Sequence, residues 1–321
     1  MVHWKACKSS PVNTDVSSRF VGFGVPTILM ATIVACVLVM TVGVFGEDVI
    51  EGGIVDEIIG GETEESAWQG SDITEVEVEK IDFQPVVDEW VETISGRKGV
   101  VIYDLDLDRI VGGYNTDEIF DTASLYKLFV VYEGYRKVES GEWKIDTPAG
   151  VTGYTIGECL DLAIRESNSV CAETLWSMIG EEALDDTVAE EYRMADTLVS
   201  DFTSTPEDIA AMMRLFYLHP NIQDEALLVQ MKDSFLNQPQ TEYDWRQGLP
   251  SGFSDTTKVY NKVGWEYDDE DGRWNIYNDA AVVEFPDNNR HFVVVVMSNN
   301  VDYRRISKFG SLLEEYFKDN T

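Results

Sequence analysis

A long apolar run near the N-terminus constrains this chain more than any other feature. No charged residue occurs between Arg19 and Glu47, and residues 21–46 are dominated by aliphatic side chains, Met, Phe, Ala and Gly. A bilayer-spanning helix needs about 20 such residues, whereas the apolar core of a cleaved signal peptide has about 7–15. The run therefore predicts a retained transmembrane helix over 21–46, and it confines any globular domain to the residues that follow.

The charges beside the apolar run predict its orientation. Lys5, Lys8 and Arg19 precede it, and basic flanks of membrane helices stay on the cytoplasmic side. We therefore expect a single-pass protein of the cell membrane, with a cytoplasmic N-terminus over 1–20 and with everything after the helix outside the cell.

The segment 47–80 differs from both of its neighbours. It is rich in Glu, Asp and Gly, and such a segment buries too little apolar surface to order itself. We expect a flexible acidic stalk over 47–80 that carries a globular domain over 81–321.

Cys36 follows Ile33-Val34-Ala35 in a sequence that loosely resembles a bacterial lipoprotein cleavage site. Cleavage or lipidation there is the alternative to a retained anchor.

Charge and metal-ligand content exclude several classes of function. The chain has 59 Asp and Glu against 24 Lys and Arg, a formal charge of −35, which repels the phosphate backbone of nucleic acids. It has three His and four Cys but no Cys-x-x-Cys or His-x-x-x-His spacing, so we expect no metal site and no cofactor.

Cys159 and Cys171 belong to the outer domain, where a disulfide is permitted. Their spacing leaves a disulfide and two buried thiols equally open.

Residue periodicity predicts the order of helices and strands in the outer domain. A helical block separates an early pair of strands from three later ones, and helices begin and end the domain. This order predicts an α+β fold of the three-layer α/β/α type, in which helices flank an antiparallel sheet that carries an inserted all-helical subdomain. The expected elements are a helix over 83–94, strands over 99–107 and 109–114, a helix over 124–138, helical segments over 155–218, strands over 258–265, 274–285 and 291–298, and a closing helix over 304–317.

Two Ser-x-x-Lys sequences occur, and their contexts differ. The sequence from Ser95 to Lys98 follows a helix and contains Gly96, which is typical of a helix-ending turn. Ser124 and Lys127 instead open an apolar helix after the strand pair. Residues three apart share one helical face, so Lys127 can reach the Ser124 hydroxyl. A Lys whose pKa is lowered can serve as the base for a Ser nucleophile, and a helix N-terminus favours a developing oxyanion.

Two further motifs complete a three-part pattern. Ser167-Asn168-Ser169 lies in a short break between helical segments, and Lys262-Val263-Gly264 begins a break in a strand. With Ser124 and Lys127, these motifs resemble the S-x-x-K, S-x-N and K-[ST]-G signature of the penicillin-recognising serine enzymes. The stretches GVVIYDLDLDRIVGGYNTDEIFDTASLYK, TSTPEDIAAMMRLFY and NKVGWEYDDEDGRWNIYNDAAVVEF also resemble successive parts of class A β-lactamases. The likeness covers roughly residues 83–319.

The resemblance implies a role for each matching residue. Ser124 would attack the substrate carbonyl, Lys127 would take its proton, and Ser167 would pass a proton to the leaving nitrogen. Lys262 would supply positive charge near Ser167 and the substrate carboxylate, and the backbone N–H groups of Ser124 and Trp265 would form the oxyanion hole. The implied catalytic residues are thus Ser124, Lys127, Ser167 and Lys262, and the implied substrate-binding residues are Ser169, Gly264 and Trp265.

Three departures from the family pattern limit this expectation. Ser169 stands where an Asn usually contacts the substrate amide, and Val263 lacks the hydroxyl that would bind the substrate carboxylate. A charge-assisted hydrogen bond of that kind is worth about 1.5–3 kcal/mol. The loop whose Glu activates the deacylating water is deleted, and Asp201 is the one nearby acid. We therefore expect acylation to be better equipped than release.

Three functions fit the sequence. The first is a class A β-lactamase-like serine hydrolase that acts through an acyl-enzyme on a β-lactam or a related cyclic or peptide amide. The second is a D-Ala-D-Ala-type cell-wall peptidase, which would be acylated by β-lactams, release them slowly, and take peptidoglycan-like peptides as substrates. The third is a non-catalytic binding or sensor domain on the same fold. The complete Ser-Lys-Ser-Lys set argues against the third, and the missing Glu argues against a strong form of the first.

Overall fold

The computed structural model describes residues 80–238, 244–268 and 273–321. The expected cytoplasmic segment over 1–20, the membrane helix over 21–46 and all but the last residue of the stalk over 47–80 lie outside these ranges. Among the described residues, none of the helices combines the length and apolar character needed to cross a membrane.

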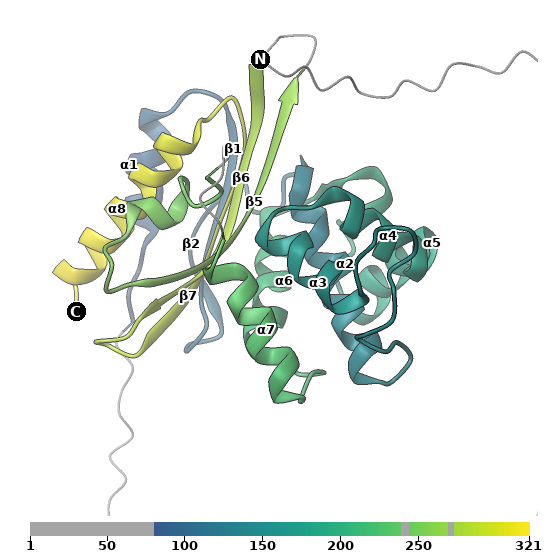
Figure 1. Cartoon of the computed structure of the whole chain (residues 1–321). Helices are drawn as coiled ribbons and strands as arrows, with labels where there is room; N and C mark the ends of the chain where they lie inside the picture. Colours follow the sequence, from purple (N-terminus) through teal and green to yellow (C-terminus); the bar gives the residue numbers. More distant parts are fainter. Residues whose placement is uncertain (1–79, 239–243, 269–272) are drawn as a thin grey trace, which may run out of the picture. The chain divides into compact units, whose positions relative to one another are not determined.

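An antiparallel sheet of five strands forms the middle layer of the domain (Figure 1). The strands are β1 (Arg97–Asp104), β2 (Arg109–Tyr114), β5 (Lys258–Asp268), β6 (Arg273–Phe285) and β7 (Arg290–Asn299). Their order is β2-β1-β7-β6-β5, and every neighbouring pair is antiparallel. The central strand β7 is buried without interruption from Phe292 to Ser298. Because both of its faces are covered, its sequence is a continuous apolar run instead of an alternating one.

Helices cover both faces of the sheet, as Figure 1 shows. One face packs against α1 (Gln84–Thr93) and α8 (Tyr303–Asp319), and the Trp90 indole N–H joins these two helices by donating to the Arg305 carbonyl at 2.9 Å. The opposite face packs against a helical block inserted between β2 and β5. The three-layer α+β fold with an inserted helical subdomain is therefore confirmed. The helices of the block are α2 (Tyr126–Glu139), α3 (Ile156–Arg165), α4 (Ser169–Ile179), α5 (Glu181–Asp186), α6 (Pro206–Leu218) and α7 (Glu225–Leu236).

Short elements and helix caps position the loops of the helical block. A two-stranded sheet pairs β3 with β4 next to the start of α2. Side-chain oxygens of Thr155, Asn168 and Thr205 accept hydrogen bonds from backbone N–H groups in the first turns of α3, α4 and α6. These N–H groups have no acceptor within their own helix. The short elements are β3 (Phe120–Asp121), β4 (Thr203–Ser204), the 3₁₀ turns η1 (Ala123–Leu125), η3 (Val199–Asp201) and η4 (Leu249–Gly252), and the π-helical turn η2 (Thr187–Glu191).

The prediction of a break in the strand at Lys262 was wrong. Strand β5 continues through Lys262 and Gly264 to Asp268, with full pairing to β6 across this region. Its irregularity lies further on, between Glu266 and Tyr267. Gly264 stays paired within the ladder. Its lack of a side chain allows a neighbouring turn to approach the strand closely.

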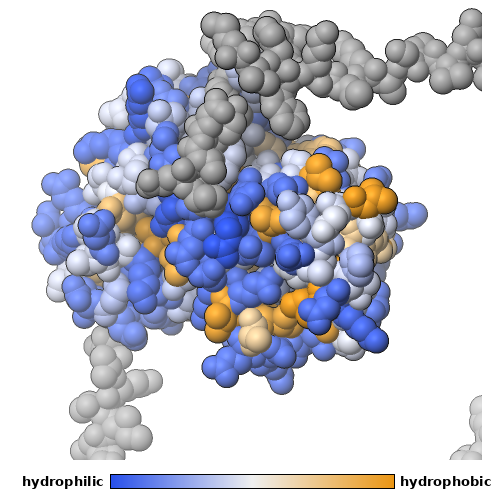
Figure 2. Space-filling model, in the orientation of Figure 1, coloured by the Kyte–Doolittle hydropathy of each residue, from blue (hydrophilic) through white to orange (hydrophobic). Residues whose placement is uncertain are grey.

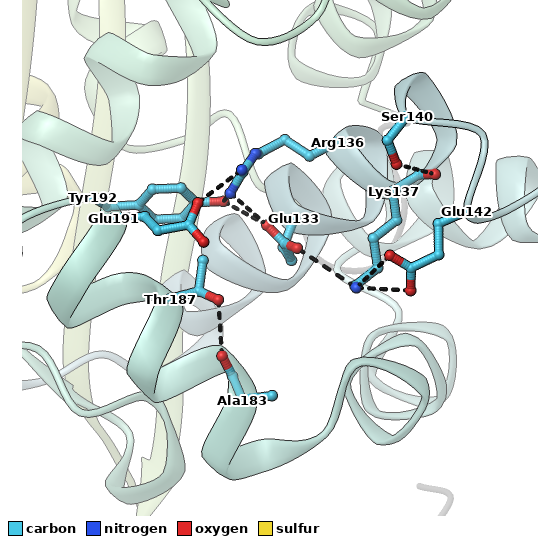
Figure 3. Close-up of polar contacts among 9 residues, drawn as sticks. All are labelled: Glu133, Arg136, Lys137, Ser140, Glu142, Ala183, Thr187, Glu191 and Tyr192. Atoms are coloured by element: carbon cyan, nitrogen blue, oxygen red, sulfur yellow. Dashed lines mark hydrogen bonds and ion pairs between the residues drawn. The ribbon is translucent and has the colours of Figure 1, made fainter. Parts of the chain in front are cut away.

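A buried carboxylate fixes the far end of α2 to the turn that follows α5 (Figure 3). Glu133 accepts from the Arg136 guanidinium at 3.0 Å and from the Tyr192 hydroxyl at 2.7 Å, and the Lys137 ammonium lies at 3.8 Å. Arg136 also donates to Glu191 at 2.8 Å. A carboxylate that is only about one-tenth exposed needs such partners to offset the loss of water.

Replacing Glu133 with Ala should lower the free energy of unfolding by about 2–3 kcal/mol, because the Tyr192 hydroxyl and the Arg136 guanidinium lose a buried acceptor. Glu142 is the matched control, since it pairs with Lys137 alone and its side chain is 58% exposed. Glu142→Ala should change stability by less than about 0.5 kcal/mol. Urea unfolding measures both variants, and equal effects would contradict this account of the cluster.

Candidate active site

The first part of the site is the turn that precedes α2. Ser124 lies in η1, and Lys127 lies in the first turn of α2. The Lys127 ammonium nitrogen, Nζ, donates to the Ser124 hydroxyl oxygen at 3.0 Å. The preceding Ala123 has a left-handed backbone (φ 44°), which is uncommon for a residue other than Gly. The predicted contact between Ser124 and Lys127 is therefore present.

The loop between α3 and α4 supplies the second part. Lys127 Nζ donates to the Ser167 carbonyl oxygen at 2.6 Å, to Ser167 Oγ at 3.2 Å and to Ser169 Oγ at 3.0 Å. Ser167 also has a left-handed backbone (φ 55°). Asn168, between the two serines, caps α4 by accepting from the Cys171 N–H at 2.9 Å. Its side chain holds the loop, while the two serine hydroxyls face Lys127.

Strand β5 supplies the third part. Lys262 Nζ donates to Ser167 Oγ at 3.0 Å and to the Val263 carbonyl oxygen at 2.6 Å. A chain of hydrogen bonds thus runs from Ser124 through Lys127 and Ser167 to Lys262. The four residues predicted as catalytic come from three distant segments, and the fold brings them together.

Burial sets the charge of both lysines. Lys127 is 0% and Lys262 is 1% exposed, and loss of water disfavours an ammonium ion. Burial lowers the pKa of Lys127 to about 8, although the Glu173 carboxylate opposes the shift. Burial, and then the positive charge of Lys127, lowers the pKa of Lys262 well below its usual value. Lys127 can therefore lose its proton near pH 8, as a side chain that serves as a general base must do.

Gly264 lets β5 lie directly against the Ser124 turn. A Cβ atom at this position would lie 2.3 Å from the Thr122 carbonyl oxygen and 3.1 Å from the Leu125 nitrogen. Only a glycine fits such an approach without displacing backbone. Trp265 follows, lines the cleft beside Ser124, and stacks on Tyr303 with a ring-centroid separation of 5.5 Å. The predicted substrate-binding residues Gly264 and Trp265 thus lie beside the nucleophile turn, and Ser169 lies beside Lys127.

Asn278 on β6 is a positioning residue that the sequence analysis missed. Its side-chain amide donates to the carbonyl oxygens of Asp121 at 2.8 Å and Thr122 at 3.1 Å, and its carbonyl accepts from the Ser298 N–H at 2.9 Å. It is fully buried and pairs with Gly264 across the β5–β6 ladder. Asn278 therefore fixes the backbone just before Ser124. The available signal was a polar pair, Asn278-Asp279, directly before the apolar run from Ala280 to Val283.

A disulfide joins the helices on either side of the Ser167 loop. Cys159 of α3 and Cys171 of α4 form this bond, with Cα atoms 4.8 Å apart. The structure thus selects the disulfide over the two free thiols that the spacing left open. Within the described ranges, no group of three or more His, Cys, Asp or Glu side chains is placed to hold a metal ion.

A cleft of about 750 Å³ opens beside Ser124. Its walls include Tyr126, Phe202 and Trp265, together with the exposed carboxylate of Asp201. The short segment that carries Asp201 is docked by two bonds to the Phe202 carbonyl oxygen, from the Thr122 N–H at 2.7 Å and from the Thr122 hydroxyl at 3.1 Å. The acid that the sequence singled out is therefore part of the cleft wall.

Comparison with known proteins agrees with this geometry. The family model described as "Beta-lactamase enzyme family" matches residues 83–317. No curated protein matches the chain. Among solved structures, the class A β-lactamase of the last common ancestor of Gram-negative bacteria has a TM-score of 0.61 at 22% identity and covers 72% of this chain and 97% of its own. A β-lactamase from Xanthomonas campestris pv. campestris has a TM-score of 0.62 at 17% identity, with coverage of 73% and 97%. At these identities, the likeness to solved structures concerns the fold.

Proposed function

Because this chain belongs to the beta-lactamase enzyme family, we propose that it is a serine hydrolase that forms an acyl-enzyme on Ser124. The observation that carries the proposal is the 3.0 Å contact from Lys127 Nζ to Ser124 Oγ. It joins a potential nucleophile to a buried base whose pKa is lowered to about 8, which is the pairing that activates a serine.

In the proposed acylation, neutral Lys127 takes the proton of Ser124 while Ser124 Oγ bonds to the substrate carbonyl carbon. The backbone N–H groups of Ser124 and Trp265 stabilise the resulting oxyanion. When the carbon–nitrogen bond breaks, Ser167 gives its proton to the leaving nitrogen. Lys127 then returns a proton to Ser167 along their 3.2 Å contact, and the second contact of Ser167, from Lys262, keeps its hydroxyl in place.

The substrate we propose is a β-lactam or a related cyclic or peptide amide, and no metal or cofactor takes part in the steps above. A second candidate is a cell-wall peptidase of the D-Ala-D-Ala type, which is acylated but releases the acyl group slowly. The segment between η2 and β4 favours this candidate. This segment folds back through the paired residues Leu198 and Thr203. Among the described residues, the acid that it brings to the cleft wall is Asp201, and the segment has no Glu that could activate a deacylating water.

One experiment separates the candidates. The purified protein is incubated with a chromogenic cephalosporin and with a labelled penicillin, and intact mass is followed over time, with Ser124→Ala as control. Sustained colour supports the hydrolase, and a long-lived adduct that disappears in Ser124→Ala supports the slow-release peptidase. If neither turnover nor adduct forms, the proposal of Ser124 acyl-enzyme chemistry fails for these substrates, and a non-catalytic domain is the remaining candidate.

We also propose that the domain lies outside the cytoplasm, held by the apolar segment over 21–46. The Cys159–Cys171 disulfide supports this placement, because stable disulfides are rare in reducing compartments. In intact cells, a membrane-impermeant thiol reagent should label the domain only after a reductant is added. A domain that stayed unlabelled in intact cells after reduction, although lysed cells treated in the same way were labelled, would contradict the proposal, and a Cys159→Ala/Cys171→Ala variant controls for Cys7 and Cys36.

A further inference from the structure

The cleft beside Ser124 indicates where the acyl part of a substrate must lie. Its walls include Ser124 and Trp265, whereas Ser167, Ser169 and Lys262 do not line it. In the proposed function, on which this inference rests, the leaving nitrogen departs toward Ser167. The acyl group that stays on Ser124 therefore occupies the cleft, and the side chains of the cleft wall determine which acyl groups fit.

Three acidic residues line this acyl space, Asp121, Asp201 and Glu266, and the segments that carry the first two are paired with each other. Asp121 and Asp201 are both exposed and both line the cleft. In the part of the chain that the structure describes, neither carboxylate makes a hydrogen bond or an ion pair, and no Lys, Arg or His lines the cleft. Strand pairing between Asp121 and Thr203 holds both segments in place. An incoming acyl group thus meets the carboxylates of Asp121 and Asp201, which no Lys, Arg or His among the described cleft residues neutralises.

Aromatic rings form a second, independent feature of the same wall. Phe202 packs edge-on against Tyr126, with ring centroids 5.0 Å apart, and remains 43% exposed. Tyr267 also lines the cleft and is 45% exposed. The faces of aromatic rings attract cations within about 6 Å. A positively charged acyl group would therefore gain from the rings as well as from the carboxylates.

Neither Lys127 nor Lys262 is available to receive an anionic acyl group. The ammonium of Lys127 already donates to Ser124, Ser167 and Ser169, and that of Lys262 donates to Ser167 and the Val263 carbonyl. Both lysines are buried, and burial lowers the pKa of each. Val263 is 1% exposed and has no hydroxyl to offer.

We propose that the cleft selects substrates whose acyl group carries a positive charge, such as a primary ammonium, and disfavours acyl groups that carry a carboxylate. The chain has a formal charge of −35, and the face in Figure 2 is largely hydrophilic. A general effect of net charge must therefore be separated from an effect of the cleft. Asp287 allows this, because it is exposed and lies in the turn after β6, at the opposite end of that strand from the cleft residues Asn275 and Ile276.

Three penicillins with one nucleus provide the test. Benzylpenicillin, ampicillin and carbenicillin differ at a single carbon of the acyl group, which carries hydrogen, an ammonium and a carboxylate, respectively. Their second-order rate constants for acylation of Ser124 are measured by intact mass at about pH 6.5, where an α-ammonium keeps its proton. We expect ampicillin to react fastest and carbenicillin slowest, with about a tenfold ratio between them. High salt should reduce the ratio, since exposed charges are screened.

Substitutions then assign the ratio to the cleft. Asp201→Asn and Asp121→Asn should each reduce the ampicillin-to-carbenicillin ratio about two- to fivefold, whereas Asp287→Asn should leave it unchanged. Equal rates for the three penicillins in the parent protein, or an equal effect of Asp287→Asn, would overturn the inference while leaving acylation of Ser124 established. If none of the three penicillins acylates Ser124, the proposed function itself fails, and this inference fails with it.

Discussion

Replacing Lys127 with Met should slow acylation of Ser124 by about 10²–10⁴-fold, because the variant removes the general base and leaves a side chain of similar length. The amine lies 3.0 Å from the Ser124 hydroxyl, closer than the 3.2 Å to the Ser167 hydroxyl. The rate of covalent labelling by a penicillin measures the loss. Circular dichroism shows whether the variant remains folded.

The pH dependence of the same rate provides a separate readout. The base must be neutral, so acylation should rise with pH and reach half of its maximum near the Lys127 pKa of about 8. Below that pH, the rate should fall about tenfold per unit, as expected for one protonating group. A Lys127→Met variant that kept both the rate and this pH midpoint would contradict the assignment.

Lys98 offers a matched control from the other Ser-x-x-Lys sequence. Its amine donates to the Ile94 carbonyl oxygen at the end of α1, so it completes a helix-ending turn, as its sequence context predicted. Lys98→Met should leave the acylation rate and its pH midpoint unchanged, even if it lowers stability. A loss of acylation equal to that of Lys127→Met would mean that the two motifs cannot be separated by function.

Replacing Gly264 with Ala should reduce acylation by about 10²-fold, because a displacement of roughly 1 Å at reacting groups has an effect of that size. The new Cβ would lie 2.3 Å from the Thr122 carbonyl oxygen and 2.9 Å from the Leu125 Cγ. Strand β5 would have to move away from the Ser124 turn, and the Trp265 N–H proposed for the oxyanion hole would move with it. Labelling kinetics and thermal unfolding together measure the effect.

Gly141 is the control for this substitution. It has a left-handed backbone (φ 78°), but a Cβ there would meet no atom within 4 Å. Gly141→Ala should therefore lower stability by about 1 kcal/mol through backbone strain alone, with acylation unchanged. If Gly264→Ala labelled within about twofold of the parent rate, the close approach of β5 would not matter for catalysis.

The order of elements could be predicted because most of them have clear periodicity. Helix α1, strand β2 and the three late strands lie within a few residues of the predicted spans. Helix α7 was missed for a physical reason. Its inward face includes Gln230 and Ser234, whose side chains donate to the Gly157 carbonyl at 2.7 Å and to Asp161 at 2.6 Å. The other buried residues of α7, Leu227, Met231 and Phe235, are apolar, but Val229 on another face is 63% exposed. Apolar residues on more than one face, with the polar Ser234 in the buried one, weaken the periodicity that predicts a helix.

The small β3–β4 sheet could not be predicted from pattern. Each strand has two residues, which is too short for an alternating sequence to appear. Its pairing joins residues more than 80 positions apart, and such a contact depends on the tertiary fold. The wrong strand break at Lys262 has the same origin, because the role of Gly264 is set by the turn that packs against it.

The four motif residues of the candidate site could be predicted from the sequence, but the residue that positions the Ser124 turn could not. Ser124, Lys127, Ser167 and Lys262 stood out through motif order, and the structure brings all four into one hydrogen-bonded chain. Asn278 carries no motif of its own. Its role rests on bonds to backbone more than 150 residues away in the sequence, which no local pattern encodes.

The most direct test of the central claim is to locate the acyl group after brief exposure to a penicillin. The acylated protein is quenched in acid and digested, and its peptides are sequenced by mass spectrometry. We predict one modified peptide, with the whole penicillin attached to Ser124, because opening the ring loses no atoms. Attachment to Ser95, Ser167 or any other residue, or an equal adduct in Ser124→Ala, would contradict the account.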